Sequence, residues 1–330
     1  MGKNAWNKSL VKIVSLLVLL IFAFLAGSSW AAEKYPSRRI TVVIPWGAGG
    51  MSDTITRIIC RAAEKELGQP IIIINKSGAG GTIGVNYALN AAPDGYTLGV
   101  PVSSAYLNHP HLRKIPYNPL TDAIDITTIF KYNFGFAVGP DAPWNSFEDV
   151  IAYAKKNPGK FTYASAGVGT TQHIAMERIG MKEGIKWTQV PFKSGTEAVV
   201  ACLGGHTMAV VQGSKDEIPH LKAGKLKLLF TLDDRRWPAF PNAPSILEKG
   251  YDFYAMSYNS LNAPKGTPQH IIKIVEAAFN KAKKDPTFLA TLEKFQVVAG
   301  TLSGEEYSKL WKSYYGPMGK VIKALGLQQK

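Results

Sequence analysis

Apolar and polar positions along this chain fall into alternating blocks that predict strands followed by helices. Short runs of branched apolar residues, at 40–46 and 71–75, have the length and composition of buried strands. Further strand-like runs occur at 97–102, 126–130, 134–138, 161–164, 208–211 and 226–232. Between them, apolar residues recur at helical spacing at 147–156, 172–182 and 197–203. This order predicts an α/β fold.

The C-terminal part has a helical pattern from residue 268 onward. The apolar residues that recur at helical spacing here are Ile271, Ile272, Ile274, Val275 and Ala278. Such a stripe predicts a face that packs against a sheet. We therefore expect this part to contribute packing rather than chemistry.

Glycine-rich loops join several of the strands to the helices that follow. They occur at 47–50, 78–84 and 165–171, and a fourth strand-to-helix junction lies at 193–196. Glycine lets the backbone turn sharply and bring its amides close to a guest, and the positive end of the following helix favours anions. A single loop of this kind is also compatible with a simple tight connection. Several together, at the carboxyl ends of strands in an open sheet, predict a binding site for a small anion.

One glycine loop has the spacing of a dinucleotide-binding motif. Gly78, Gly80 and Gly84 follow an apolar strand and precede a helix. The acidic residue expected at the end of the following strand is missing, because Asp94 precedes that strand and Ser103 stands at its end. We therefore favour an anion site over a dinucleotide site and expect no cofactor.

Residues that would support catalysis or metal binding are sparse. His109 and His111 lack cysteine or carboxylate companions, and no Gly-x-Ser-x-Gly motif occurs. Cys60 and Cys202 are too few for a disulfide scaffold and are expected to be buried thiols. Asp53 stands where it would cap a helix rather than act as a catalytic acid. These features predict a binding protein without a metal.

The first residues have the composition of an export signal. Lys3, Lys8 and Lys12 precede an apolar run at 13–24, and small residues follow up to Ala31. We expect cleavage after Ala31, so that 1–31 is a signal peptide, with an uncleaved membrane anchor as the alternative. Removal of this segment takes away three lysines and no acid, so the net charge falls from +14 to +11. This basic balance favours small anions, whereas scattered lysines without an aromatic-basic stripe argue against nucleic acid.

Short motifs spread over nearly the whole mature chain carry a family resemblance. They include Gly78-Ala-Gly-Gly81, Pro93-Asp-Gly-Tyr96, Asn157-Pro-Gly-Lys160, Val190-Pro-Phe-Lys193 and Ala263-Pro-Lys-Gly266. In this order they resemble the motifs of Bug-type receptors, the periplasmic solute-binding proteins of tripartite tricarboxylate transporters. The resemblance implies a type II periplasmic-binding-protein fold, in which two α/β lobes are joined by crossing strands and hold a ligand in the cleft between them. It also implies a periplasmic receptor that captures a small carboxylate for the subunits of a membrane transporter, and we expect a monomer.

Carried onto this chain, the resemblance assigns limits to the lobes and names their binding residues. Lobe 1 is expected at 32–132 and 254–330, and lobe 2 at 133–253. The ligand contacts expected in lobe 1 are Trp46, Gly49, Gly50, Ser52, Asp53, Gly80, Gly81 and Ser103. Those expected in lobe 2 are Ser165, Gly167, Gly169, Thr170 and His173, with Lys193 adding charge at the rim.

The chain departs from the family pattern where the far end of a ligand would be recognised. Trp46 and Ala48 replace the usual phenylalanine and proline. Gln212 and Gly213 occupy the place of a usual acidic residue, and 258–260 replaces a tryptophan–glycine pair. The identity of the carboxylate, including whether it is aliphatic or aromatic, is therefore left open. Two other classes of function also stay open, a ligand sensor for a signalling partner and a secreted hydrolase.

Overall fold

The computed structural model describes residues 34–328. Residues 34–37 contain no helix or strand, and the first strand begins at Ile40. The signal peptide expected at 1–31 lies outside the described residues. None of the helices within 34–328 has the length and apolar character that a membrane span requires.

The first of two sheets contains six strands in the order β11-β4-β10-β3-β1-β2. These strands are β1 (Ile40–Ile44), β2 (Ile71–Asn75), β3 (Thr97–Gly99), β4 (Ala123–Lys131), β10 (Tyr258–Pro264) and β11 (Val298–Ala299). β1 pairs in parallel with β2 and β3, whereas β10 is antiparallel to β3 and β4. β1 is buried almost throughout, which agrees with the unbroken apolar run typical of a central parallel strand.

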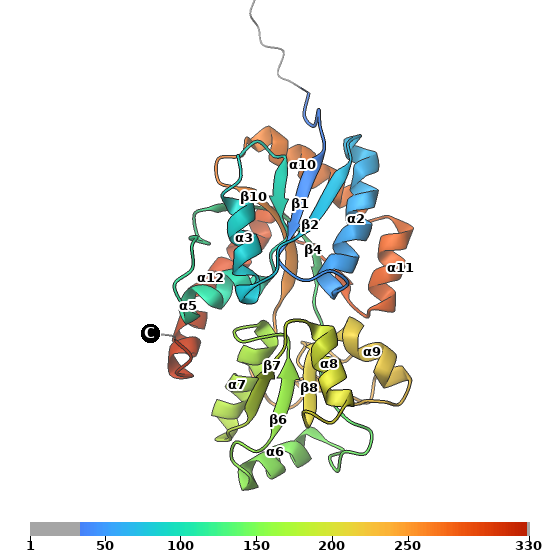
Figure 1. Ribbon diagram of the computed structural model, residues 1–330, viewed down its shortest axis with the longest axis vertical. Helices are drawn as coiled ribbons and strands as arrows, with labels where there is room; N and C mark the ends of the chain where they lie inside the picture. Colours follow the sequence, from blue (N-terminus) through green and yellow to red (C-terminus); the bar gives the residue numbers. More distant parts are fainter. Residues whose placement is uncertain (1–33, 329–330) are drawn as a thin grey trace, which may run out of the picture. The chain divides into compact units, whose positions relative to one another are not determined.

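Eight helical segments among the described residues belong to the same lobe as this sheet, and they include the C-terminal helices. They are α2 (Met51–Leu67), η1 (Ala79–Gly81), α3 (Thr82–Leu89), α4 (Ser103–Leu107), α5 (His109–Leu112), α10 (Gln269–Ala282), α11 (Pro286–Lys294) and α12 (Gly304–Ala324). α10 packs on α2 and β4 (Figure 1). Ile271, Ile272, Val275 and Ala278 are among its buried residues. The expectation for Ile274 was wrong, because its side chain is 38% exposed. With 3.6 residues per turn, Ile274 falls at the edge of the buried stripe.

The second sheet contains five strands in the order β7-β6-β8-β5-β9. They are β5 (Phe134–Val138), β6 (Thr162–Ser165), β7 (Thr188–Pro191), β8 (Ala209–Gly213) and β9 (Lys227–Thr231). The helices of this part are α6 (Phe147–Lys156), α7 (Thr171–Glu183), α8 (Gly195–Leu203) and α9 (Ser214–Lys222). β6 is parallel to β7 and β8, so the loops after β6 and β8 leave the sheet at the same edge.

Two chain segments connect the sheets. β4 of the first sheet ends at Lys131 and β5 of the second begins at Phe134. The chain returns from β9 to β10 through residues 232–257 (Figure 1). The two α/β lobes implied by the resemblance are therefore confirmed, while the limits expected for them, 32–132 with 254–330 and 133–253, stay a proposal.

The expectation for the cysteines is also confirmed. Cys60 in α2 and Cys202 in α8 are buried free thiols. Burial raises the pKa of both thiols, that of Cys202 to about 12. Both therefore stay protonated near neutral pH and act as small apolar side chains.

Candidate ligand-binding site

One pocket lies where four helices begin, and we call it the ligand pocket. Its walls contain residues from the start of α2 in one lobe and of α7, α8 and α9 in the other. These residues are Gly50, Met51, Ser52, Thr170, Thr171, Gln172, Ser194, Gly195 and Gly213. No side chain among the described residues caps the first amides of α2 or α7. Free N–H groups and the partial positive charge of a helix start attract anions, so this pocket suits an anionic guest.

The remaining wall of the ligand pocket combines aromatic and polar side chains. Trp46, Tyr132 and Phe134 contribute rings, while Lys193 and Asp216 contribute charges of opposite sign. The enclosed volume is about 100 Å³. Drug-sized ligands and cofactors occupy pockets of about 300 Å³ or more, so this one fits a small metabolite.

Hydrogen bonds fix several pocket side chains before any guest enters. The Asn259 amide donates to Ser52 Oγ at 2.7 Å, and Gln172 Nε2 donates to Gln212 Oε1 at 2.9 Å. Asp216 Oδ1 accepts from the Thr196 hydroxyl at 3.0 Å. Burial raises the pKa of Asp216, an effect that the nearby Lys215 opposes. Preorganised polar groups of this kind select among guests, because a guest that leaves them unpaired pays their desolvation.

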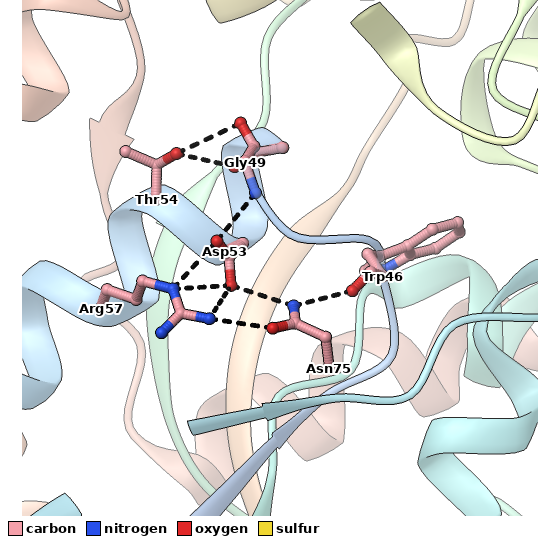
Figure 2. A network of polar contacts seen from close by, with 7 residues as sticks. Trp46, Gly49, Asp53, Thr54, Arg57 and Asn75 are labelled. Carbon is pink, nitrogen blue, oxygen red and sulfur yellow. Dashed lines mark hydrogen bonds and ion pairs between the residues drawn. The ribbon is translucent and has the colours of Figure 1, made fainter. Parts of the chain in front are cut away.

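A charged network holds the loop between β1 and α2 (Figure 2). Asp53 accepts hydrogen bonds from Gly49 N at 2.9 Å and from Arg57 Nε at 2.9 Å and 3.0 Å. The Asn75 amide donates to Asp53 Oδ1 and to the Trp46 carbonyl, both at 2.9 Å. Burial opposes the ionisation of Asp53, but the hydrogen bonds from Arg57 and Gly49 outweigh it, so the pKa of Asp53 is lowered. Asp53 is therefore an ionised anchor behind the loop.

Neutral groups hold the corresponding loop between β6 and α7. Gly169 N donates to His173 Nδ1 at 3.1 Å, and Gln189 Nε2 donates to Ser165 Oγ at 2.7 Å and to the Gly167 carbonyl at 3.0 Å. Burial lowers the pKa of His173 to about 4. Near neutral pH the imidazole is therefore uncharged, and its 3.9 Å approach to Glu177 is not an ion pair.

The glycine loop at 78–84, which contains η1, supports the loop at 47–50 instead of lining the ligand pocket. Gly81 has a φ of +91°, and a Cβ there would lie 3.3 Å from Trp46 Cζ2. Gly80 has a φ of +62°, and a Cβ there would clash with His109 Cε1. Side chains at either position would strain the backbone and displace a ring.

The expected ligand contacts divide into a group that lines the ligand pocket and a group behind it. Those that line it are Trp46, Gly50, Ser52, Thr170 and Lys193. Those outside its lining are Gly49, Asp53, Gly80, Gly81, Ser103, Ser165, Gly167, Gly169 and His173. Ser103 Oγ, for example, accepts from Tyr258 N at 2.9 Å and lies 3.1 Å from the Tyr307 hydroxyl. Direct contact of either group with a ligand stays a prediction.

Sequence reasoning missed several side chains of the ligand pocket. They are Ser104, Tyr132, Gln172 and Asp216, whereas Gln212 stood among the positions expected to recognise the far end of a ligand. A usable signal was present for two of them, since Gln172 and Asp216 lie in the first turns of α7 and α9, directly after strand ends. Tyr132 carries no such signal, because its place depends on where the chain crosses between the sheets.

A larger cavity, of about 670 Å³, lies at the start of α6 but does not offer the same chemistry. Ser146 and Asp149 form a capping box there, in which Ser146 Oγ accepts from Asp149 N and Asp149 accepts from Ser146 N. The helix end is thus satisfied by its own residues. Within 34–328, no three or more histidine, cysteine or acidic side chains gather as a metal site would require.

The two α/β lobes and the pocket at converging helix starts define a solute-binding protein. The chain belongs to the tripartite tricarboxylate transporter family receptors, whose family model matches residues 55–327. It is 37% identical over 296 residues to the "UPF0065 protein in gbd 5′ region" of Cupriavidus necator, covering 90% of each chain. It is 31% identical over 291 residues to BugT of Bordetella pertussis, covering 87% of this chain and 88% of BugT.

Solved structures show the same fold. The periplasmic binding protein BugD matches with a TM-score of 0.82 at 26% identity, over 90% of this chain and all (100%) of BugD. MatC from Rhodopseudomonas palustris, solved with malate, matches with a TM-score of 0.81 at 26% identity, over 87% of this chain and 100% of MatC. Another R. palustris protein, solved with adipate, matches with a TM-score of 0.82 at 25% identity, over 88% of this chain and 98% of that protein. The resemblance is confirmed, and the family consists of receptors that bind solutes without transforming them.

Proposed function

We propose that this receptor captures a small carboxylate in the ligand pocket and delivers it to a tripartite tricarboxylate-type membrane transporter. The observation that carries the proposal is the meeting of two uncapped helix starts, α2 from one lobe and α7 from the other, at one pocket. A carboxylate accepts several N–H donors at once, so it matches this arrangement. Adipate and malate in the two R. palustris structures support the same ligand class.

Binding is proposed to favour the closed arrangement of the lobes. The Asn108 amide donates to the Gly169 carbonyl at 2.9 Å, and Lys215 Nζ donates to the Gly49 carbonyl. Both bonds join glycine loops to the opposite lobe. A guest that contacts both loops adds to these bonds only when the lobes are closed, and so shifts the population towards that form.

Asp216 is proposed to select the far end of the ligand. A second carboxylate beside an acidic side chain is disfavoured, whereas a hydroxyl or amino group can donate to its oxygens. Asp216→Asn should therefore weaken binding of a hydroxy or amino acid more than binding of the matching unsubstituted acid. Calorimetry with malate and succinate measures this difference, and equal losses for both ligands would contradict the assignment.

A thermal-shift screen tests the function itself. Mono-, di- and tricarboxylates, including aromatic acids, are added to the mature protein, and a true ligand raises the melting temperature because it binds only the folded form. Gly50→Val should abolish the shift produced by di- and tricarboxylates, because Gly50 lines the ligand pocket, has an ordinary φ of −67°, and has room for a Cβ that meets only the Gly47 carbonyl at 3.6 Å. Gly139→Val is the matched control, since a Cβ there meets nothing within 4 Å. The proposal fails if none of the acids shifts the melting point, or if both variants retain the shift.

Export and oligomeric state belong to the same proposal. The secreted protein should begin at Ala32 after removal of 1–31. N-terminal sequencing of the periplasmic fraction and light scattering of the purified chain check processing and the expected monomer. An intact N-terminus in the membrane fraction would contradict periplasmic release.

A further inference from the structure

We propose that a second cavity, between α7 and α12, is an accessory binding site for a carboxylate with a compact apolar body. We call it the accessory cavity. It has a volume of about 210 Å³. The inference stands apart from the function proposed for the ligand pocket, because it rests on other side chains.

Two helices face each other across the accessory cavity. Ile174 and Arg178 lie one turn apart on α7, and Pro317 and Val321 lie one turn apart on α12. Residues four apart lie on the same face of a helix, so each helix presents a continuous strip to the cavity. The segment that crosses back between the sheets adds Phe253. The walls are thus mainly apolar and come from both lobes.

Arg178 is the charged group that gives the accessory cavity its specificity. Its guanidinium carbon lies 3.6 Å from the centre of the Phe253 ring. Stacking of this kind uses the face of the guanidinium and leaves its in-plane N–H donors free for a carboxylate. Within 34–328, no hydrogen bond or ion pair of the Arg178 guanidinium is found. Burial lowers the pKa of Arg178 and Asp252 opposes this effect, but an arginine stays charged near neutral pH.

The volume and the charge together define the guest. An unpaired, half-buried cation beside apolar walls is best satisfied by an anion that carries its own apolar surface. The exposed carboxylate of Asp252 lines the same cavity and works against a guest with two acid groups. Benzoate has one carboxylate and a compact ring, so it is the probe for this site.

The accessory cavity and the ligand pocket share part of a wall. Ser104 and Thr171 line both, and Thr171 is the first residue of α7. The two guests would therefore be neighbours at the same helix start, each in a cavity of its own. This geometry predicts that benzoate and the transported ligand bind together rather than in competition.

Calorimetric titration with benzoate tests the site in a protein whose ligand pocket is filled by Gly50→Val. Benzoate should bind this variant, and adding Arg178→Met should weaken binding by about tenfold or more, because a charge-assisted bidentate contact is lost. Arg178→Lys should weaken it less, since the charge remains but the planar fork is absent. Benzamide, which has the same ring without the charge, should bind the Gly50→Val protein far more weakly than benzoate.

Two results would overturn the proposal: no benzoate binding to folded Gly50→Val at millimolar concentrations, or equal affinity with and without Arg178→Met. A crystal structure of the unaltered protein soaked with 4-bromobenzoate keeps the test valid if a variant fails to fold. Bromine density in the accessory cavity, with the carboxylate at the Arg178 guanidinium, supports the site. Density confined to the ligand pocket, or density in neither place, contradicts it.

Discussion

The two glycine loops that meet at the ligand pocket have the same backbone form but are held by different chemistry. The loop after β1 is tied to an ion pair, Asp53 with Arg57 at 2.8 Å. The loop after β6 is tied to the uncharged His173 and Gln189. Both leave the first amides of their helices free for a guest. The backbone therefore supplies the binding groups, while the side chains behind it hold each loop in place.

The largest effect is expected from breaking the charged anchor. Asp53 is 4% exposed, so Asp53→Ala removes a buried acceptor shared by Gly49, Arg57 and Asn75. We expect a loss of about 2 to 3 kcal/mol in the free energy of unfolding. Breaking a fully buried ion pair would cost more, but here the Arg57 side chain can still be solvated. Urea denaturation measures the loss. Glu305→Ala, which breaks an exposed ion pair with Lys309, is the control and should leave the free energy of unfolding nearly unchanged, because solvent screens the pair. Equal losses in the two variants would show that the network does not stabilise the loop.

The next largest effect is expected from acid, because the contributions of His173 and Asp53 to stability are lost at different pH values. The pKa of His173 is lowered from 6.5 to about 4, so the unfolded chain binds more protons and stability falls as the pH drops from 6.5 towards 4. The pKa of Asp53 is lowered below 3.8, so its contribution persists above that value and is lost only in stronger acid. Stability of the unaltered protein and of His173→Gln, compared from pH 7 to pH 4, should show a flatter profile for the variant. Parallel profiles would rule out His173 as a source of the acid sensitivity.

A smaller effect is expected from the neutral anchor. Gln189→Leu removes the donor to Ser165 and to the Gly167 carbonyl, and should cost about 1 kcal/mol. Hydrogen exchange should localise the change to residues 166–170, with no change at 45–50. Gln269→Leu, at an exposed position outside both loops, is the control. Faster exchange at both loops would mean that the anchors are not independent.

The smallest effect is expected at the rim of the ligand pocket. Lys193 is exposed, so Lys193→Gln should weaken carboxylate binding by about 0.5 to 1 kcal/mol and reduce its dependence on salt. Calorimetry at two salt concentrations, with whichever acid shifts the melting point, measures both quantities. An unchanged salt dependence would remove Lys193 from the electrostatics of the site.

The sequence predicted the strands and the helix starts better than the side chains that line the ligand pocket. β2, β5 and α6 have the bounds expected from their apolar pattern, because local composition determines them. α4 and α5 were missed because they are short, and β11 was missed because its two residues are defined by pairing with β4.

The site shows the same division between local and long-range causes. Gly50, Ser52 and Thr170 follow from a local motif, a strand end that opens a helix. Tyr132 and Gln212 do not, since their place depends on how the second sheet is assembled and where the chain enters it. Asp53 and His173 were expected at the ligand, and in the structure both are buried and hold their loops through hydrogen bonds, while their contact with a ligand stays a prediction. Pattern alone does not distinguish a residue that touches a guest from one that holds the loop in place.

The short crossing from β4 to β5 has a consequence for how occupancy is signalled. Only Tyr132 and Asn133 separate the two strands, and the Tyr132 ring forms part of the ligand pocket wall. Asn133 is tied through its amide to the Gln296 carbonyl. Any rotation of one lobe against the other has to bend this short connection, one residue of which lines the ligand pocket. Ligand binding can therefore affect the movement of the lobes directly, without a chain of contacts through the protein interior.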